Sequence, residues 1–234
     1  MLKRFLLAAA LCFSILLGGG GCMRADTARN NRQNINDVAL NHLERKYGGK
    51  FEYNSPWGNS MSGTRSFLVT CDSLPEKQIL VQIENFQNDD FEIRDNYLAV
   101  KYELETIDYL SSIANQVFGE AIVFYDLAFQ TLSADLNATA SFHEYLADTR
   151  VPLHIMFEVK LSGFSSKDQA LLLADLIASN GSYFRISLVV VSDDIYGSHD
   201  SVSLEKLMAQ DGFEHCAKID RLDGNIEIRW LGEE

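Results

Sequence analysis

The chain has 234 residues, of which 47% are hydrophobic, 23% are charged and only 3 are proline. This composition excludes an intrinsically disordered protein, because such chains carry too little apolar surface to form a core. Lysine and arginine number 20 against 33 acidic residues, so the formal net charge is −13. A charge this negative argues against a nucleic-acid-binding surface, which needs basic side chains to displace counterions from phosphate. The length suits one domain or two small ones.

The first 21 residues have the layout of a secretory signal peptide. Lys3 and Arg4 form a short basic segment, residues 5–17 are almost wholly apolar, and four glycines over 18–21 precede Cys22. A basic start, a short apolar run and small residues at its end are what signal peptidases recognise. The apolar run is also shorter than the about 20 residues that cross a bilayer.

The end of this segment resembles the lipobox of bacterial lipoproteins. In that family a cysteine behind small residues is acylated and becomes the mature N-terminus, and the resemblance gives this role to Cys22, with Gly21 before it. Gly19 stands where the family usually has leucine. The resemblance implies palmitate-type acylation of Cys22 and a lipid-anchored location on the extracytoplasmic face of the cell membrane. An uncleaved N-terminal anchor and a plain secreted protein are the alternatives.

Removal of this segment would take Lys3 and Arg4 with it and lower the net charge from −13 to −15. A body this acidic does not adhere to anionic headgroups by itself, so attachment would depend on the lipid. We divide the chain into a signal peptide over 1–21, a polar tether over 22–36, an α-β-β-β-α half over 37–118 and an alternating β/α half over 119–234. One continuous sheet is the alternative to two halves.

The first half is predicted to hold two helices with three strands between them. The strands alternate apolar and polar residues, and the helices repeat apolar residues every three or four positions. The predicted bounds are a helix over 37–47, strands over 50–57, 65–71 and 78–86, and a long helix from Asp95 or Asn96 to Gly119. This helix-then-three-strands opening resembles the PepSY class of small exported domains, linked to peptidase inhibition, over about a third of the chain.

The second half alternates strands and helices and closes with a β-hairpin. Its apolar Val189–Val191 segment predicts a central strand. The predicted elements are a strand over 121–129, a helix over 141–147, a strand over 153–160, a helix over 167–179 capped by Ser165, a strand over 183–191, a helix over 203–210, and a hairpin of 213–222 and 225–231 around Asp223-Gly224. The fold class is therefore α+β, with mostly antiparallel or mixed sheets packed with helices.

Four cysteines are present, of which Cys12 lies in the signal segment and Cys22 is the lipidation candidate. Cys71 and Cys216 remain for the folded part. In an exported protein they can form a disulfide that closes a long loop. Two free thiols are the alternative reading. No CxxC motif or Cys/His cluster is present, so no metal site is predicted.

Two sequences look like catalytic motifs but are incomplete. His143-Glu144 begins an HExxH zinc motif, but Ala147 occupies the place of the second histidine. Ser203 and Lys206 match the SxxK of penicillin-recognising enzymes, without the SDN and KTG elements that work beside it. We therefore expect Ser203 to cap a helix.

The five histidines are scattered, and His154 faces away from the apolar side of its predicted strand. We expect a surface-exposed lipoprotein that acts as a binding or interaction module without catalysis and without a cofactor. Its partners are the membrane, through the lipid on Cys22, and an unidentified protein or small-molecule ligand, while nucleic acid is excluded. The alternative is an envelope hydrolase whose site is assembled from residues far apart in sequence. The sequence leaves the oligomeric state open.

Overall fold

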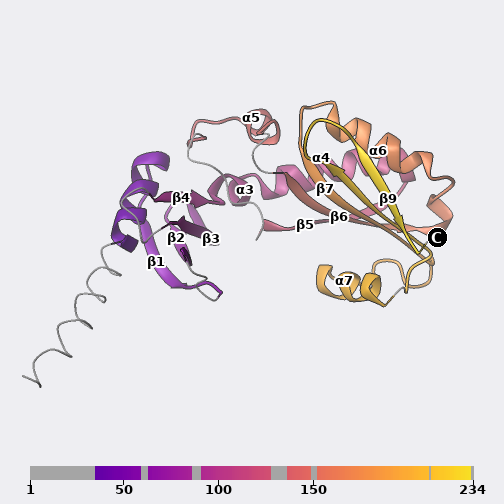
Figure 1. Cartoon of the computed structure of the whole chain (residues 1–234), viewed down its shortest axis with the longest axis horizontal. Coiled ribbons are helices and arrows are strands. Elements are labelled where there is room, and N and C mark those ends of the chain that lie inside the picture. The colour runs from indigo at the N-terminus through magenta and orange to yellow at the C-terminus, as the bar shows by residue number, and fades with distance from the viewer. Residues whose placement is uncertain are drawn as a thin grey trace, which may run out of the picture.

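The computed structural model describes residues 35–58, 63–85, 91–127, 136–148, 152–210 and 212–232. The signal segment and nearly all of the tether, with Cys22, lie outside these ranges. The fold is α+β and contains two sheets (Figure 1). Two sheets rather than one continuous sheet are therefore present. None of the helices in the described ranges is long and apolar enough to cross a membrane.

The first sheet is an antiparallel meander in the order β1-β2-β3-β4. A helix over 35–47 and the short helix α3 (Tyr97–Lys101) accompany it. Its strands are β1 (Phe51–Pro56), β2 (Thr64–Cys71), β3 (Leu74–Glu84) and β4 (Glu92–Asp95). Strand β4 has no counterpart among the predicted elements, because a four-residue strand that reads Glu-Ile-Arg-Asp has a single apolar position and no visible alternation.

A buried polar cluster fixes the helix over 35–47 to this sheet. The Asp95 carboxylate, which has no solvent exposure, accepts from Lys46 Nζ at 2.8 Å and from the Tyr47 hydroxyl at 2.7 Å. The backbone N–H of Tyr97 also donates to Asp95, and the rings of Tyr47 and Tyr97 stack at 4.0 Å between centroids. The end of the helix, the last strand and the start of α3 thus share one carboxylate.

The second sheet is mixed and follows the order β5-β6-β7-β8-β9. Only β6 and β7 are parallel, and α6 connects them, as a parallel pair requires. Its elements are β5 (Ala121–Tyr125), β6 (Leu153–Lys160), the 3-10 turn η2 (Leu161–Gly163), α6 (Asp168–Ala178), β7 (Phe184–Val191), β8 (His215–Arg221) and β9 (Glu227–Leu231). The central position predicted for β7 and the C-terminal hairpin of β8 and β9 are confirmed.

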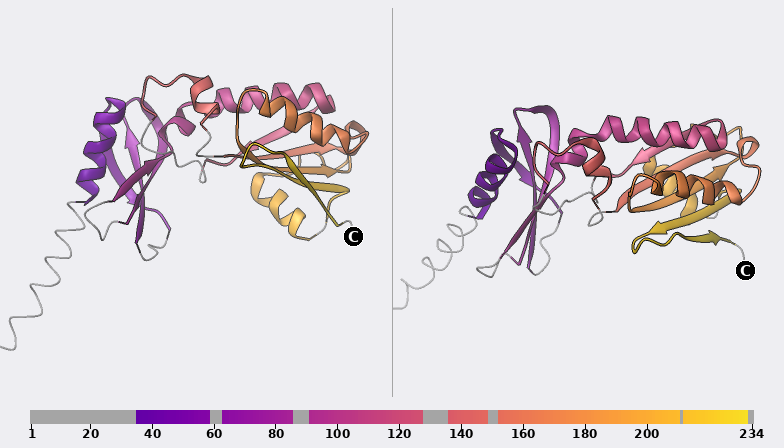
Figure 2. Two further views of the ribbon diagram at one scale, coloured as in Figure 1. Left: turned by 45° about the horizontal axis from the view of Figure 1, so that its top comes forward. Right: turned by 90° about the horizontal axis from the view of Figure 1, so that it is seen from above.

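Helices cover the two faces of this second sheet unequally. Figure 1 and the left view of Figure 2 place α4 (Glu103–Phe118) and α6 on one face, and α7 (Ser201–Ala209) on the other. Buried residues such as Leu110 of α4 and Leu173 of α6 share one apolar core with Phe157 and Leu188 of the sheet. The short helix α5 (Phe142–Leu146) lies near α3 and α4, with Tyr102 packed on Tyr145. One face of the sheet is thus closed, and the other is only partly covered by α7.

The long helix predicted from Asp95 or Asn96 to Gly119 is divided at Tyr102 into α3 and α4. Tyr102 has φ −101° and ψ 14°, and its buried hydroxyl donates to the Ala140 carbonyl at 2.6 Å. The Thr106 hydroxyl also donates to the carbonyl of Tyr102, a contact that bends helices. Tertiary contacts of Tyr102 and Thr106 therefore interrupt an apolar pattern that reads as continuous.

The N-caps of α6 and α7 differ from those expected from the sequence: Lys167 and Asp200 occupy these positions instead of Ser165 and Ser203. Ser165 does not cap α6; instead the Gln169 side chain accepts from the backbone N–H of Ser165 at 2.6 Å. Ser203 lies inside α7, where it forms a capping box with the N-cap residue Asp200. At α5 the expected helix has a capping box of Ser141 and Glu144.

Candidate functional site

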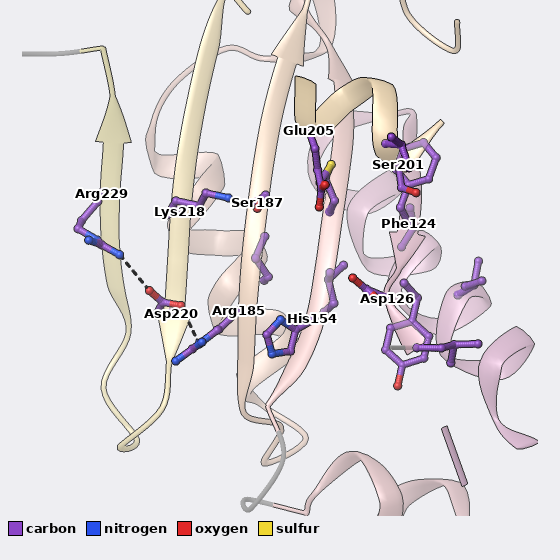
Figure 3. Close-up of a pocket in the computed structure, with 18 residues that line it drawn as sticks. Phe124, Asp126, His154, Arg185, Ser187, Ser201, Glu205, Lys218, Asp220 and Arg229 are labelled. Carbon is purple, nitrogen blue, oxygen red and sulfur yellow. Dashed lines mark hydrogen bonds and ion pairs between the residues drawn. The ribbon is translucent and has the colours of Figure 1, made fainter. Parts of the chain in front are cut away.

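The open face of the second sheet carries a continuous row of side chains, one from each strand. Register pairs Phe124 with Met156, Met156 with Ser187, Ser187 with Lys218, and Lys218 with Arg229. Because residues that are directly paired project to the same face, this register brings them together although they are far apart in sequence. The row runs from apolar at β5 and β6 to basic at β8 and β9 (Figure 3).

A second row runs beside the first. His154 pairs with Arg185, and Arg185 pairs with Asp220. The Asp220 carboxylate lies 3.9 Å from Arg185 Nε and 3.4 Å from Arg229, so two guanidinium groups share one carboxylate. At the β5 end the backbone N–H of Asp126 donates to the His154 carbonyl, which continues the pairing past the last residue of β5.

Helix α7 forms a wall above these rows. Leu204 is fully buried against Val189 and Cys216 of the sheet, and the capping box of Asp200 and Ser203 fixes the start of the helix. Ser201, Val202 and Glu205 of α7 then line a groove with the two rows of the sheet. Its volume is about 1050 Å³, at the upper end of the range for small-molecule sites.

Lys218 holds the centre of the basic side of the groove. Its ammonium donates to the Ser187 hydroxyl at 2.6 Å, and the side chain is partly buried. In the part of the chain that the structure describes, no carboxylate forms an ion pair with it. An ammonium has three N–H donors, and one hydrogen bond to a neutral hydroxyl leaves its charge and its other donors able to bind an anion.

His154 lies beside Arg185 in the second row of the groove (Figure 3). Burial lowers the pKa of its imidazole below the ordinary value of 6.5, and the adjacent Arg185 lowers it further. The carboxylates of Asp126 and Asp220 oppose this shift. At neutral pH the His154 ring is therefore uncharged, and the positive charge of the groove comes from lysine and arginine.

The segment that leads into α7 is held by a buried carboxylate. Glu158 has no solvent exposure, and its Oε1 lies 2.7 Å from His199 Nδ1 and accepts from the backbone N–H of Gly197. Within the described ranges its Oε2 has no hydrogen-bond partner. Burial, Glu120 and Glu158 raise the pKa of Tyr196 to about 12, so its hydroxyl stays protonated. These contacts join the 192–200 segment to β6.

The two cysteines considered for a disulfide are both free and buried. Cys71 ends β2 of the first sheet, where its Sγ lies 3.0 Å from Ser73 Oγ. Cys216 lies on β8 of the second sheet beneath α7, and burial raises its pKa to about 11. The structure therefore has two free thiols, which the sequence allowed as the alternative to a disulfide. A thiol with this pKa is protonated at neutral pH and reacts slowly.

The incomplete motifs do not contribute to the groove. His143 is exposed on α5, and no group of three metal-binding side chains occurs among the described residues. Ser203 is occupied by its capping box. Of the histidines, only His154 lines the groove, and its outward position on β6 agrees with the expected alternation. The sequence did not single out Lys218, Ser187 or Arg185. What could have pointed to them is that each is a polar residue within a predicted strand that is otherwise rich in apolar residues.

Comparisons with known proteins are sparse. No family model and no curated protein sequence matches the chain. Among solved structures, the chain is similar to a DUF5037 family protein from Ruminococcus gnavus ATCC 29149, with 10% sequence identity and a TM-score of 0.38. The match covers 82% of this chain and 94% of that chain. We base no conclusion about fold or function on a likeness of this size.

Proposed function

We propose that this protein is an exported lipoprotein, anchored through Cys22 on the extracytoplasmic face of the membrane, and that it acts as a binding module. Its ligand site is the groove between α7 and the open face of the second sheet. The observation that carries the proposal is the ammonium of Lys218, which lies in a groove of about 1050 Å³ without a carboxylate partner among the described residues. An opposite charge on the neighbouring strand would neutralise such a lysine and stabilise the sheet, whereas a ligand site keeps a charge available.

An envelope hydrolase is the second candidate, and one contact favours it. Ser187 and Lys218 form a hydrogen-bonded Ser–Lys pair from positions far apart in sequence, an arrangement that some acyl-transfer enzymes use. However, β7 is paired on both sides, so its backbone N–H groups bond within the sheet. They are not available as an oxyanion hole beside Ser187. Binding therefore accounts for the groove better than hydrolysis does.

The anchor is tested by growing a bacterial host that expresses the full chain with an alkyne analogue of palmitate. We expect the wild type to be labelled and to partition into detergent, and the Cys22→Ser variant to lose both properties. Cys71→Ser is the matched control and should be labelled like the wild type. Labelling that persists in Cys22→Ser would contradict the anchor.

The choice between binding and hydrolysis is tested with a fluorophosphonate, which reacts with activated serines. Mass spectrometry of the treated protein should find Ser187 unmodified, because the backbone N–H groups of β7 bond within the sheet and do not form an oxyanion hole beside it. Stoichiometric modification of Ser187 that is lost in Lys218→Met would favour the hydrolase and contradict a purely binding role.

A further inference from the structure

The groove separates its charges into two sides (Figure 3). Arg185, Lys218 and Arg229 extend from β7, β8 and β9, with Asp220 between them, which leaves a formal charge of +2. On the other side lie the exposed carboxylate of Glu205 on α7 and, beyond β5, the side chain of Asp126. A ligand that is only anionic or only cationic would be repelled by one of these sides, whereas a ligand with one charge at each end fits both.

Between Lys218 and the β5 side of the groove, the lining includes apolar side chains. Phe124 and Met156 occupy the β5 and β6 positions of the first row, and Val202 of α7 faces the groove with 56% of its surface exposed. Burying apolar side chains here gains free energy, while the charges at the two ends set the orientation of the ligand. The site therefore suits a molecule with charged ends and an apolar centre.

The spacing of the strands gives the length of such a molecule. From Lys218 on β8 to Asp126 beside β5 there are three strand separations, which together span about 14 Å. An extended peptide covers about 3.3–3.6 Å per residue, so about four residues fill this distance. In a free amino acid the two charged groups sit on the same carbon, and it cannot reach both sides of the groove.

We infer that the groove takes a short peptide of about four residues with free termini, with its C-terminal carboxylate on Lys218 and its ammonium on the acidic side of the groove, at the end of β5 and beside Glu205. This inference rests on the proposed binding function and names its ligand class. The Ser187 hydroxyl holds the Lys218 ammonium in place, and Arg229 adds positive charge beside the carboxylate. The apolar side chains of the peptide lie on Phe124 and Met156.

The test is calorimetric titration of the full chain in detergent with the tetrapeptide alanyl-leucyl-leucyl-alanine. We expect binding by the peptide with free termini and about 10-fold weaker binding by its C-terminal amide, because amidation removes the charge-assisted bond to Lys218. N-terminal acetylation should weaken binding about 3-fold, since Glu205 is exposed. Inorganic phosphate serves as a second probe for the basic side alone.

Three variants locate the carboxylate. Lys218→Met keeps the aliphatic stem and should abolish the difference between free and amidated peptide, whereas Lys218→Arg should preserve it. Lys206→Met, on α7 but outside the groove, removes the same charge and should change nothing. Equal affinity for free and amidated peptide in the wild type, or an unchanged preference in Lys218→Met, would overturn the inference.

The probes also separate this inference from the proposed function. Phosphate binding that depends on Lys218, without peptide binding, would overturn the peptide assignment and leave the groove as a ligand site. Absence of binding by every probe, together with an unlabelled Cys22, would overturn both.

Discussion

The two sheets of this molecule each have one helix-covered face and one open polar face, but their charges are compensated differently. On the open side of the first sheet, Arg94 contacts two carboxylates, Glu92 at 3.0 Å and Glu84 at 3.5 Å. On the open side of the second, Arg185 and Arg229 share Asp220. The arginine of the first face is thus fully compensated by carboxylates, whereas the second face keeps positive charge for a partner. Polarity alone does not distinguish a binding surface from a solvated one; the balance of charges and the concavity do.

The covered faces differ as well. The helix over 35–47 is attached to the first sheet through the buried ion pair of Lys46 and Asp95, whereas α4 and α6 cover the second sheet with apolar side chains. Substitutions in the buried cluster should therefore cost more stability than matched substitutions in the open groove.

Asp95→Ala should lower the free energy of unfolding by about 3–5 kcal/mol, because it removes the buried carboxylate that accepts from the Lys46 ammonium, the Tyr47 hydroxyl and the backbone N–H of Tyr97. Asp220→Ala is the matched control: it also removes an aspartate with more than one partner, here two arginines, but from a groove open to solvent, and should cost about 0–1 kcal/mol. Urea unfolding followed by tryptophan fluorescence measures both. Equal losses in the two variants would contradict the contrast between the buried and the open cluster.

Leu204→Ala should cost about 2–3 kcal/mol, near the low end for buried leucine because the cluster beneath α7 is small. The same change should also weaken peptide binding, since α7 is the wall of the groove. Val202→Ala, at an exposed position two residues away, should alter stability by no more than about 0.5 kcal/mol. A stable Leu204→Ala variant would show that α7 is not held by this side chain.

Asp200→Ala should cost about 1 kcal/mol, because it removes the side chain that accepts from the backbone N–H of Ser203 at the start of α7. Asp200→Ser, which retains an acceptor, should recover most of the loss. Thermal unfolding monitored by circular dichroism distinguishes the two, and the capping assignment fails if both variants are equally destabilised.

The smallest effect concerns pH. Because burial lowers the pKa of His154 in the folded state, the unfolded chain binds a proton first as pH falls below about 6.5. The stability contributed by neutral His154 is therefore complete above this pH and is lost as pH falls through the folded pKa. His154→Gln should make the decline of the unfolding free energy between pH 7 and pH 5 shallower. His143→Gln, at an exposed position on α5, should leave the slope unchanged; equal slopes in wild type and His154→Gln would refute the burial argument.

Much of the fold could be predicted because its strands are strongly patterned. The alternation in residues 153–160 predicted β6, the apolar run in residues 183–191 predicted β7, and Asp223-Gly224 predicted the hairpin turn. The short β4 and the break at Tyr102 could not be read, because each depends on partners distant in sequence. Cys22 lies outside the described residues, and its lipidation stays a prediction.

The groove could be predicted only in part. Outward positions such as His154 were visible from alternation, but their grouping required the register that sets Ser187 beside Lys218. Helix α7 adds to this difficulty. Its pattern predicts a short helix, while only the burial of Leu204 shows which face of the sheet it covers. A charge without a partner is a property of the assembled sheet and has no signature in a single strand.

The most direct test of the central claim is the rate at which acetic anhydride acetylates Lys218, measured by mass spectrometry of the full chain with and without the free tetrapeptide. The account predicts that saturating peptide slows acetylation of Lys218 several-fold and leaves Lys206 unaffected, because only the first ammonium lies in the groove. An unchanged rate at Lys218 under saturating peptide would contradict the assignment of the groove as the ligand site.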